Sequence, residues 1–100
     1  MPRVDLTPDA QNDLKEIWDY VARDSQVQAD RLLRRFAEKF EHLTVHRGYG
    51  RPRPELAKGC RSHPFGSYCF YFRQTEEGIL RLRVLHSARD IRQIEFPKAP

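Results

Sequence analysis

The segment RLRVLHSARD, residues 81–90, carries the side chains best suited to chemistry. His86 can act as a general acid or base, because the free pKa of histidine lies near neutrality. Four arginines within twelve residues could stabilise negative charge: Arg81, Arg83, Arg89 and Arg92. His86 could equally be a strand residue that makes one hydrogen bond. The segment is therefore a ribonuclease site or a cationic surface that binds a target without catalysis.

Two other groups of residues could bind a ligand. Cys60, His63 and Cys69 are possible metal ligands, but only three occur and their spacing fits no common structural zinc pattern, so we predict neither metal nor cofactor. The aromatic residues from position 68 onward lie beside arginines, as in an RNA stacking platform. At hairpin spacing the same pattern is typical of core packing and cross-strand pairs.

Length and composition limit the class of protein. One hundred residues, 39% of them hydrophobic and 11% aromatic, predict a single packed domain over residues 1–100 with a disordered tail at 97–100. No apolar run reaches the length of a membrane span, and the N-terminal residues lack the apolar segment of a secretory signal. We therefore predict a cytoplasmic protein without membrane contact, whose two cysteines are thiols.

Positive charge is concentrated in the second half of the chain. Residues 1–50 hold 8 Lys or Arg and 9 Asp or Glu, whereas residues 51–100 hold 10 and 5. A basic half suits either nucleic acid or an acidic protein partner, and charge alone does not choose between them.

Periodicity predicts two helices after a short N-terminal strand that contains Val4 and Leu6. Thr7 and Pro8 form a helix start, and Asp9 and Asp13 suit its positive end. One apolar stripe follows: Ala10, Leu14, Ile17, Trp18 and Val21. Ser25 with Gln28 forms a capping box that begins a second helix, which continues to about residue 45. The very short connection predicts an antiparallel helix hairpin.

The remaining sequence predicts an antiparallel sheet. Residues 46–59 are rich in glycine and proline, and two strands then flank Gly66-Ser67, a pair suited to a type II′ turn. That turn would place Cys60 opposite Arg73 and Cys69 opposite Pro64, too far apart for a disulfide. A third strand follows residues 75–78. The predicted fold class is α+β, in the order β-α-α-β-β-β, with the helix hairpin on one face of a small antiparallel sheet.

The length of the loop at 75–78 decides which side chains of the last two strands lie on the same face of the sheet. A two- or four-residue loop at 75–78 places Phe70 and Phe72 on the face of Arg81 and Arg83. A three-residue loop instead places Tyr71 and Arg73 beside those arginines.

The order of these motifs resembles a known family. LTPDAQNDLKEIWDYV, GRPRPEL, RSHPFGSYCFYFR and LRVLHSARDI resemble the ParE branch of the RelE/ParE toxin superfamily, from about residue 3 to 96. The resemblance implies a toxin of a type II toxin–antitoxin system that inhibits DNA gyrase and is neutralised by a ParD-like antitoxin. Its alternatives are a RelE-like ribosome-dependent mRNA endonuclease and a non-toxic antitoxin-binding module.

One departure favours a protein that is not an enzyme. RelE-type nucleases usually have a tyrosine or histidine near the C-terminus, and the tail IRQIEFPKAP has neither. If the protein inhibits gyrase, we predict target contacts at Arg81, Arg83, Arg89 and Arg92, and only indirect contact with nucleic acid. Antitoxin contacts are predicted at Trp18, Val21 and Tyr71. For the endonuclease the catalytic residues would be Arg83, His86 and Arg89.

Overall fold

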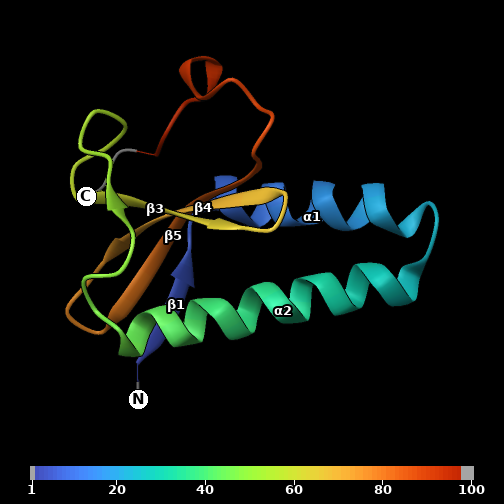
Figure 1. Cartoon of the computed structure of the whole chain (residues 1–100), viewed down its shortest axis with the longest axis horizontal. Coiled ribbons are helices and arrows are strands. Elements are labelled where there is room, and N and C mark those ends of the chain that lie inside the picture. The colour runs from blue at the N-terminus through green and yellow to red at the C-terminus, as the bar shows by residue number, and fades with distance from the viewer. Residues whose placement is uncertain (1, 98–100) are drawn as a thin grey trace.

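The computed structural model describes residues 2–97, in which two helices cover one face of a five-stranded sheet (Figure 1). The elements are β1 (Arg3–Leu6), α1 (Pro8–Ala22), α2 (Gln26–Val45), β2 (Arg51–Pro52), β3 (Cys60–Phe65), β4 (Tyr68–Gln74), β5 (Gly78–His86) and a 3-10 turn (Ile91–Gln93). The predicted order is confirmed, with β2 as an added strand of two residues. The predicted tail lies outside the described residues except for Pro97.

The sheet has the order β1-β5-β4-β3-β2 and is mixed. The last three strands pair antiparallel, as the sequence predicts, whereas β1 joins β5 in parallel from Arg3 opposite Gly78 to Leu6 opposite Arg81. Gly78 permits this pairing, because a Cβ there would lie 1.9 Å from the carbonyl oxygen of Arg3. The N-terminal strand thus completes the sheet at the edge beside β5.

Both helices begin where their capping residues predict. The Thr7 hydroxyl accepts a hydrogen bond from the backbone N–H of Ala10 at 3.1 Å and donates to the carbonyl of Leu82 at 2.9 Å. The Ser25 hydroxyl accepts from the N–H of Gln28 at 3.1 Å. Thr7 therefore both caps α1 and fastens it to β5.

The β3–β4 hairpin has the predicted two-residue turn. Phe65 pairs with Tyr68, and Gly66 has a φ of +58°, as the first central position of a type II′ turn requires. Cys60 lies opposite Arg73 and Cys69 opposite Pro64, and both thiols are free. The predicted register is confirmed along the whole hairpin.

A β-bulge between β4 and β5 decides the facing of the arginines. Phe72 pairs with Arg81, while Tyr71 pairs with Arg83, and the register shifts between the two pairs. Phe72 thus lies beside Arg81, as the two- or four-residue loop predicts, and Tyr71 lies beside Arg83, as the three-residue loop predicts. Arg81 lies on the helix face and Arg83 opposite Tyr71, so the two arginines do not share a surface.

The sheet has an apolar cluster on each face. The helix-side cluster packs α2 on the sheet through its buried members: Phe36, Phe40, Leu43, Phe70, Phe72, Ile79 and Val84. On the other face Cys60, Tyr71, Leu82 and Leu85 are covered by residues of two irregular segments: Leu56, Ala57, Ile91, Ile94 and Phe96. The C-terminal segment is thus part of the fold. Among residues 2–97, neither helix combines the length and apolar composition that crossing a membrane requires.

Candidate functional site

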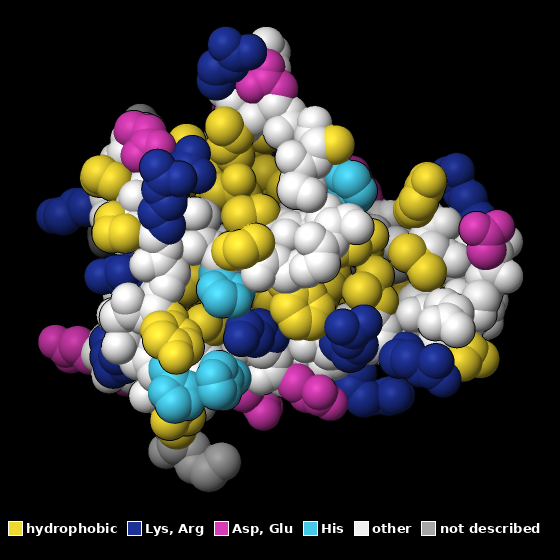
Figure 2. Space-filling view, in the orientation of Figure 1, with side chains coloured by type: hydrophobic (Ala, Val, Ile, Leu, Met, Phe, Trp, Pro, Cys, Tyr) yellow, Lys and Arg dark blue, Asp and Glu magenta, His cyan; other side chains and the backbone are white. Residues whose placement is uncertain are grey.

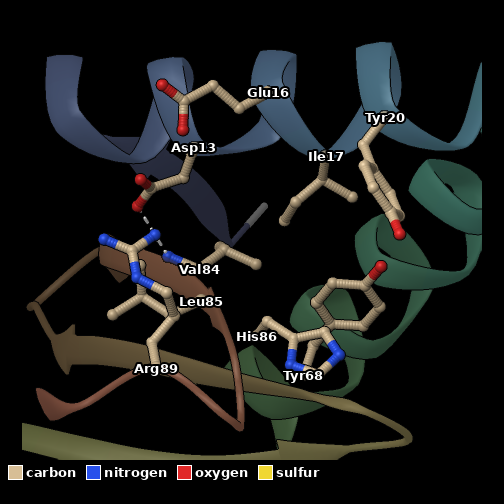
Figure 3. Close-up of a pocket in the computed structure, with 9 residues that line it drawn as sticks. All are labelled: Asp13, Glu16, Ile17, Tyr20, Tyr68, Val84, Leu85, His86 and Arg89. Atoms are coloured by element: carbon tan, nitrogen blue, oxygen red, sulfur yellow. Dashed lines mark hydrogen bonds between the residues drawn. The ribbon is translucent and has the colours of Figure 1, made fainter.

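A cleft of about 280 Å³ opens between α1 and the adjoining ends of β4 and β5. Figure 3 shows side chains of α1 that project toward Tyr68 and toward the end of β5. The lining residues are Asp13, Glu16, Ile17, Tyr20, Tyr68, Val84, Leu85, His86 and Arg89. Their arrangement gives a cleft with an apolar floor and charged or hydroxyl groups at its rim.

Asp13 and Arg83 form a buried ion pair beside this cleft. Arg83 Nε lies 2.7 Å from Asp13 Oδ2, and Arg83 Nη2 lies 2.7 Å from Oδ1. The Asp13 side chain is 3% exposed and that of Arg83 is 14% exposed. Asp13 Oδ2 also accepts the backbone N–H of Val84 at 3.0 Å, and Arg83 Nη1 donates to the carbonyl of Glu95 at 2.9 Å. The hydrogen bonds and charge of Asp13 raise the pKa of Arg83. Because every one of these charge-assisted bonds links different segments, the pair connects α1 with β5 and with the segment at Glu95.

His86 ends β5 as an exposed side chain. Its Nδ1 accepts one hydrogen bond, from the N–H of Ala88 at 3.1 Å, and its ring meets the Tyr68 ring edge-on at 5.4 Å between centroids. Burial raises the pKa of the Tyr68 hydroxyl, which therefore stays a hydrogen-bond donor near neutral pH. His86 therefore has the single side-chain hydrogen bond expected of a structural residue at the end of a strand.

The four arginines of the segment have different surroundings. Arg81 is half-buried, with its guanidinium 5.3 Å from the centroid of the Phe40 ring, and burial lowers its pKa. Arg92 is exposed and pairs with Asp90 at 3.1 Å. Arg89 is exposed, lines the cleft and makes no ion pair within residues 2–97. Of the three residues that an endonuclease would use, only His86 and Arg89 meet in the cleft.

The three residues predicted to bind an antitoxin do not lie together. Trp18 is half-buried, and its Nε1 donates to Asp30 on α2 at 2.8 Å; Val21 is also half-buried on α1. Tyr71 is 7% exposed and packs edge-on against Phe96 on the opposite face of the sheet. Burial raises the pKa of Tyr71 to about 12. Trp18 and Val21 remain near one accessible helix surface, whereas Tyr71 belongs to the core.

No site role was predicted from the sequence for Glu16, Tyr20 or the Asp13 carboxylate, and Tyr68 was considered only as part of a possible RNA stacking platform. Glu16 and Tyr20 share one helix face, four residues apart, and Tyr68 begins β4. Asp13 lies three residues after the fully buried Ala10, so an acidic side chain at that position was the available signal of a buried partner. Within residues 2–97 no three His, Cys, Asp or Glu side chains are grouped so as to hold a metal ion.

The topology and the cleft beside α1 define a small α+β domain in which a helix hairpin covers one face of a mixed sheet. The family model described as the ParE toxin of type II toxin-antitoxin system, parDE, matches residues 4–91. This chain therefore belongs to the ParE toxin family.

Relatives agree with that assignment over most of the chain. Toxin ParE1 of Mycobacterium tuberculosis is 34% identical over 88 residues, which cover 86% of this chain and 90% of the relative. A solved structure titled as the chromosomal ParDE TA system from P. aeruginosa superposes with a TM-score of 0.69 and 25% identity. It covers 86% of this chain and 96% of the solved one.

Proposed function

We propose that this ParE-family chain inhibits DNA gyrase by binding to it, without catalysis, in the cytoplasm. We also propose that a ParD-like antitoxin with an acidic tail neutralises it. Membership of the family supports the toxin role, and the charge of the chain suits an acidic partner.

The ion pair of Arg83 is the main observation in favour of a toxin that binds its target without catalysis. Cleavage of RNA requires a group that moves protons and free cations that stabilise the phosphorane. Asp13 neutralises Arg83, and Asp90 pairs with Arg92. His86 and Arg89 are then left as an incomplete set, and residues 91–97 add neither tyrosine nor histidine.

Arg89 is the arginine best placed for target contact. It is exposed at the rim of the cleft and makes no ion pair within the described chain. A protein target that buries this guanidinium would make Arg89 a dominant contact. We propose Arg81 and Arg92 as lesser contacts, because Arg81 is half-buried over Phe40 and Arg92 is already paired.

The antitoxin surface is proposed along α1, near Trp18 and Val21 and over the mouth of the cleft. Tyr20 is 68% exposed there beside Ile17, so apolar side chains of a partner helix could bury both. Arg89 and Arg23 would face acidic residues of that tail, since both are exposed.

Two assays in parallel test the gyrase proposal: gyrase supercoiling and cleavage of ribosome-bound mRNA, each titrated with the purified chain. We expect lost supercoiling and intact mRNA. His86→Gln should inhibit gyrase as the original chain does, while Arg89→Gln should lose about 2 kcal/mol of binding, roughly thirtyfold. Arg92→Gln is the matched control and should change inhibition little. Intact supercoiling together with codon-positioned mRNA cuts would replace this proposal by the endonuclease.

A further inference from the structure

The whole formal net charge of the chain resides in one segment, residues 47–61. This segment holds five of the 18 Lys and Arg but one of the 14 Asp and Glu. The remaining 85 residues therefore carry 13 charges of each sign, and the net charge of +4 belongs to these 15 residues. Figure 2 shows Lys and Arg side chains gathered at the left of the molecule, where Figure 1 places β2 and its flanking loops. We call residues 47–61 the basic loop.

The basic loop is held in a defined shape although it contains little regular structure. Arg61 Nη1 donates to the carbonyls of Gly48 at 3.2 Å and Gly50 at 3.0 Å. Strand β2 pairs with β3, and the N–H of Arg53 donates to the carbonyl of Cys60 at 2.8 Å. The backbone that carries these charges is therefore already ordered, and a partner would have to immobilise only the exposed side chains.

Three cations of the basic loop remain available to a ligand. Arg47, Arg51 and Lys58 are exposed and make no ion pair within the described part of the chain. Arg47 Nη2 donates to the carbonyl of Thr75 at 2.7 Å, which holds this side chain in place and leaves its charge uncompensated. Arg53, by contrast, pairs with Glu55 at 2.8 Å. The row of basic side chains on α2 differs, because Asp30, Glu38 and Glu41 lie among them. Helix α2 holds four Lys or Arg and three Asp or Glu, a net charge of +1, whereas the basic loop has a net charge of +4. The loop therefore has the larger local excess of positive charge.

The loop offers charge and an aromatic ring rather than an apolar anchor. Its apolar side chains, Leu56 and Ala57, pack into the second cluster under the sheet. Tyr49 is 51% exposed and its ring stacks on that of His46 at 5.5 Å. Protein partners bind tightly through buried apolar or aromatic anchors in pockets, whereas exposed charges contribute little to such interfaces. Polyanion binding has no such requirement, because neutralised phosphates release counterions.

We propose that the basic loop binds the phosphate backbone of a nucleic acid, through Arg51, Lys58 and Arg47 and without sequence preference. Duplex DNA and single-stranded RNA present the same chemistry, and Tyr49 could stack on an unpaired base of the latter. This contact goes beyond the proposed action on gyrase, which depends on Arg89 at the cleft.

The proposal is tested by fluorescence anisotropy of the full chain with a DNA duplex of about 20 base pairs and an RNA strand of similar length, at roughly 50 to 200 mM salt. We expect binding to one or both, with a slope of log K against log salt of about −2 to −3, which corresponds to two or three phosphate contacts. Arg51→Gln with Lys58→Gln should weaken binding about tenfold or more at the lowest salt and reduce the slope by about 2.

Lys15→Gln with Arg34→Gln is the matched control, because it removes the same two charges from exposed positions on the helices. It should leave the slope within error of the unmodified chain. Thermal unfolding should show that both double variants fold, since all four side chains are exposed. Equal losses in the two double variants, or no saturable binding at the lowest salt, would overturn the proposal. So would competition by poly-glutamate as effective as that by DNA, because the partner would then be an acidic polypeptide.

Discussion

The Asp13 carboxylate accepts three hydrogen bonds, two from the Arg83 guanidinium and one from the backbone of Val84. It thereby joins α1 to β5, and through the Glu95 carbonyl Arg83 extends the joint to the C-terminal segment. Both side chains lie almost out of contact with water, so each charge depends on the other. Loss of one partner leaves a buried charge, which costs more than loss of the pair.

Asp13→Ala should therefore destabilise the chain by about 3 to 5 kcal/mol, because Arg83 and the Val84 N–H lose their acceptor. Urea unfolding followed by circular dichroism measures the change. The double replacement Asp13→Leu with Arg83→Met should recover most of the loss, since no charge is then buried. A loss below about 1 kcal/mol for the single variant would show that the joint is not a stabilising element.

Cys60 gives the fold a dependence on alkaline pH. Burial raises the pKa of its thiol from 9.0 to about 11. The folded chain then holds this proton more tightly than the unfolded chain, so the stabilisation is complete below pH 9.0 and is lost as the pH rises through about 11. Unfolding free energies measured across that window should fall for the original chain and change less for Cys60→Ala. Equal slopes for the two proteins would contradict the assignment to this thiol.

At the scale of elements, the parallel contact between β1 and β5 depends on one missing side chain. Gly78→Ala would drive a Cβ into the backbone of Arg3, at 1.9 Å from its carbonyl oxygen. We expect a loss of about 2 kcal/mol or more in unfolding free energy, together with faster hydrogen exchange in β1. Gly48→Ala is the control: its φ is also positive, at +96°, but nothing lies within 4 Å of the added Cβ. Equal losses would mean that backbone conformation, not the close approach, governs both positions.

The elements that the sequence could predict are those with a local signal. Thr7 and Ser25 mark helix starts through their own side-chain hydrogen bonds, and Gly66 fixes its turn through a single dihedral angle. The bulge near Tyr71 had no such signal. It shifts the alternation of β5, so that Ile79 and Val84 both enter the helix-side cluster while Leu82 and Leu85 both enter the cluster on the other face. Strict alternation would not allow either pair to share a face, and the need for the shift arises from packing between segments that are distant in sequence.

The candidate site was less predictable for the same reason. Arg81, Arg83, Arg89 and Arg92 were predicted to act as one group because they lie close together along the chain. Asp13 lies seventy residues from Arg83 in the sequence, and of these four arginines it forms an ion pair with Arg83 alone. Tyr71 was likewise predicted to contact the antitoxin, but the ring of Phe96 packs over it. Long-range partners decide which charged and aromatic groups stay available.

For the molecule as a whole, the strand ends that line the cleft and the basic loop around β2 lie at different ends of the sheet, as the ribbon in Figure 1 shows. The proposed antitoxin needs only the first of these. Co-expression with a ParD-like partner should give a complex that survives purification, and saturating partner at a hundredfold its Kd should stabilise the fold by about 2.7 kcal/mol.

Tyr20→Ala should weaken this complex, because it removes an aromatic ring that is 68% exposed at the mouth of the cleft. Lys15→Ala, on the same helix but outside the cleft lining, serves as the control. Calorimetric titration measures both affinities. Recovery of free chain alone from co-expression would count against an antitoxin on this surface.

The contacts of Thr7 and Asp13 with β5 have a consequence for solubility. Strand β1 pairs with β5 only as far as Arg81, and the next positions would offer unpaired backbone groups to any passing strand. The Thr7 hydroxyl donates a hydrogen bond to the Leu82 carbonyl, and the Asp13 carboxylate accepts one from the Val84 N–H. These two side chains therefore take up backbone groups of β5 with which a further strand would pair, and this stretch of the edge is a poor template for an intermolecular sheet.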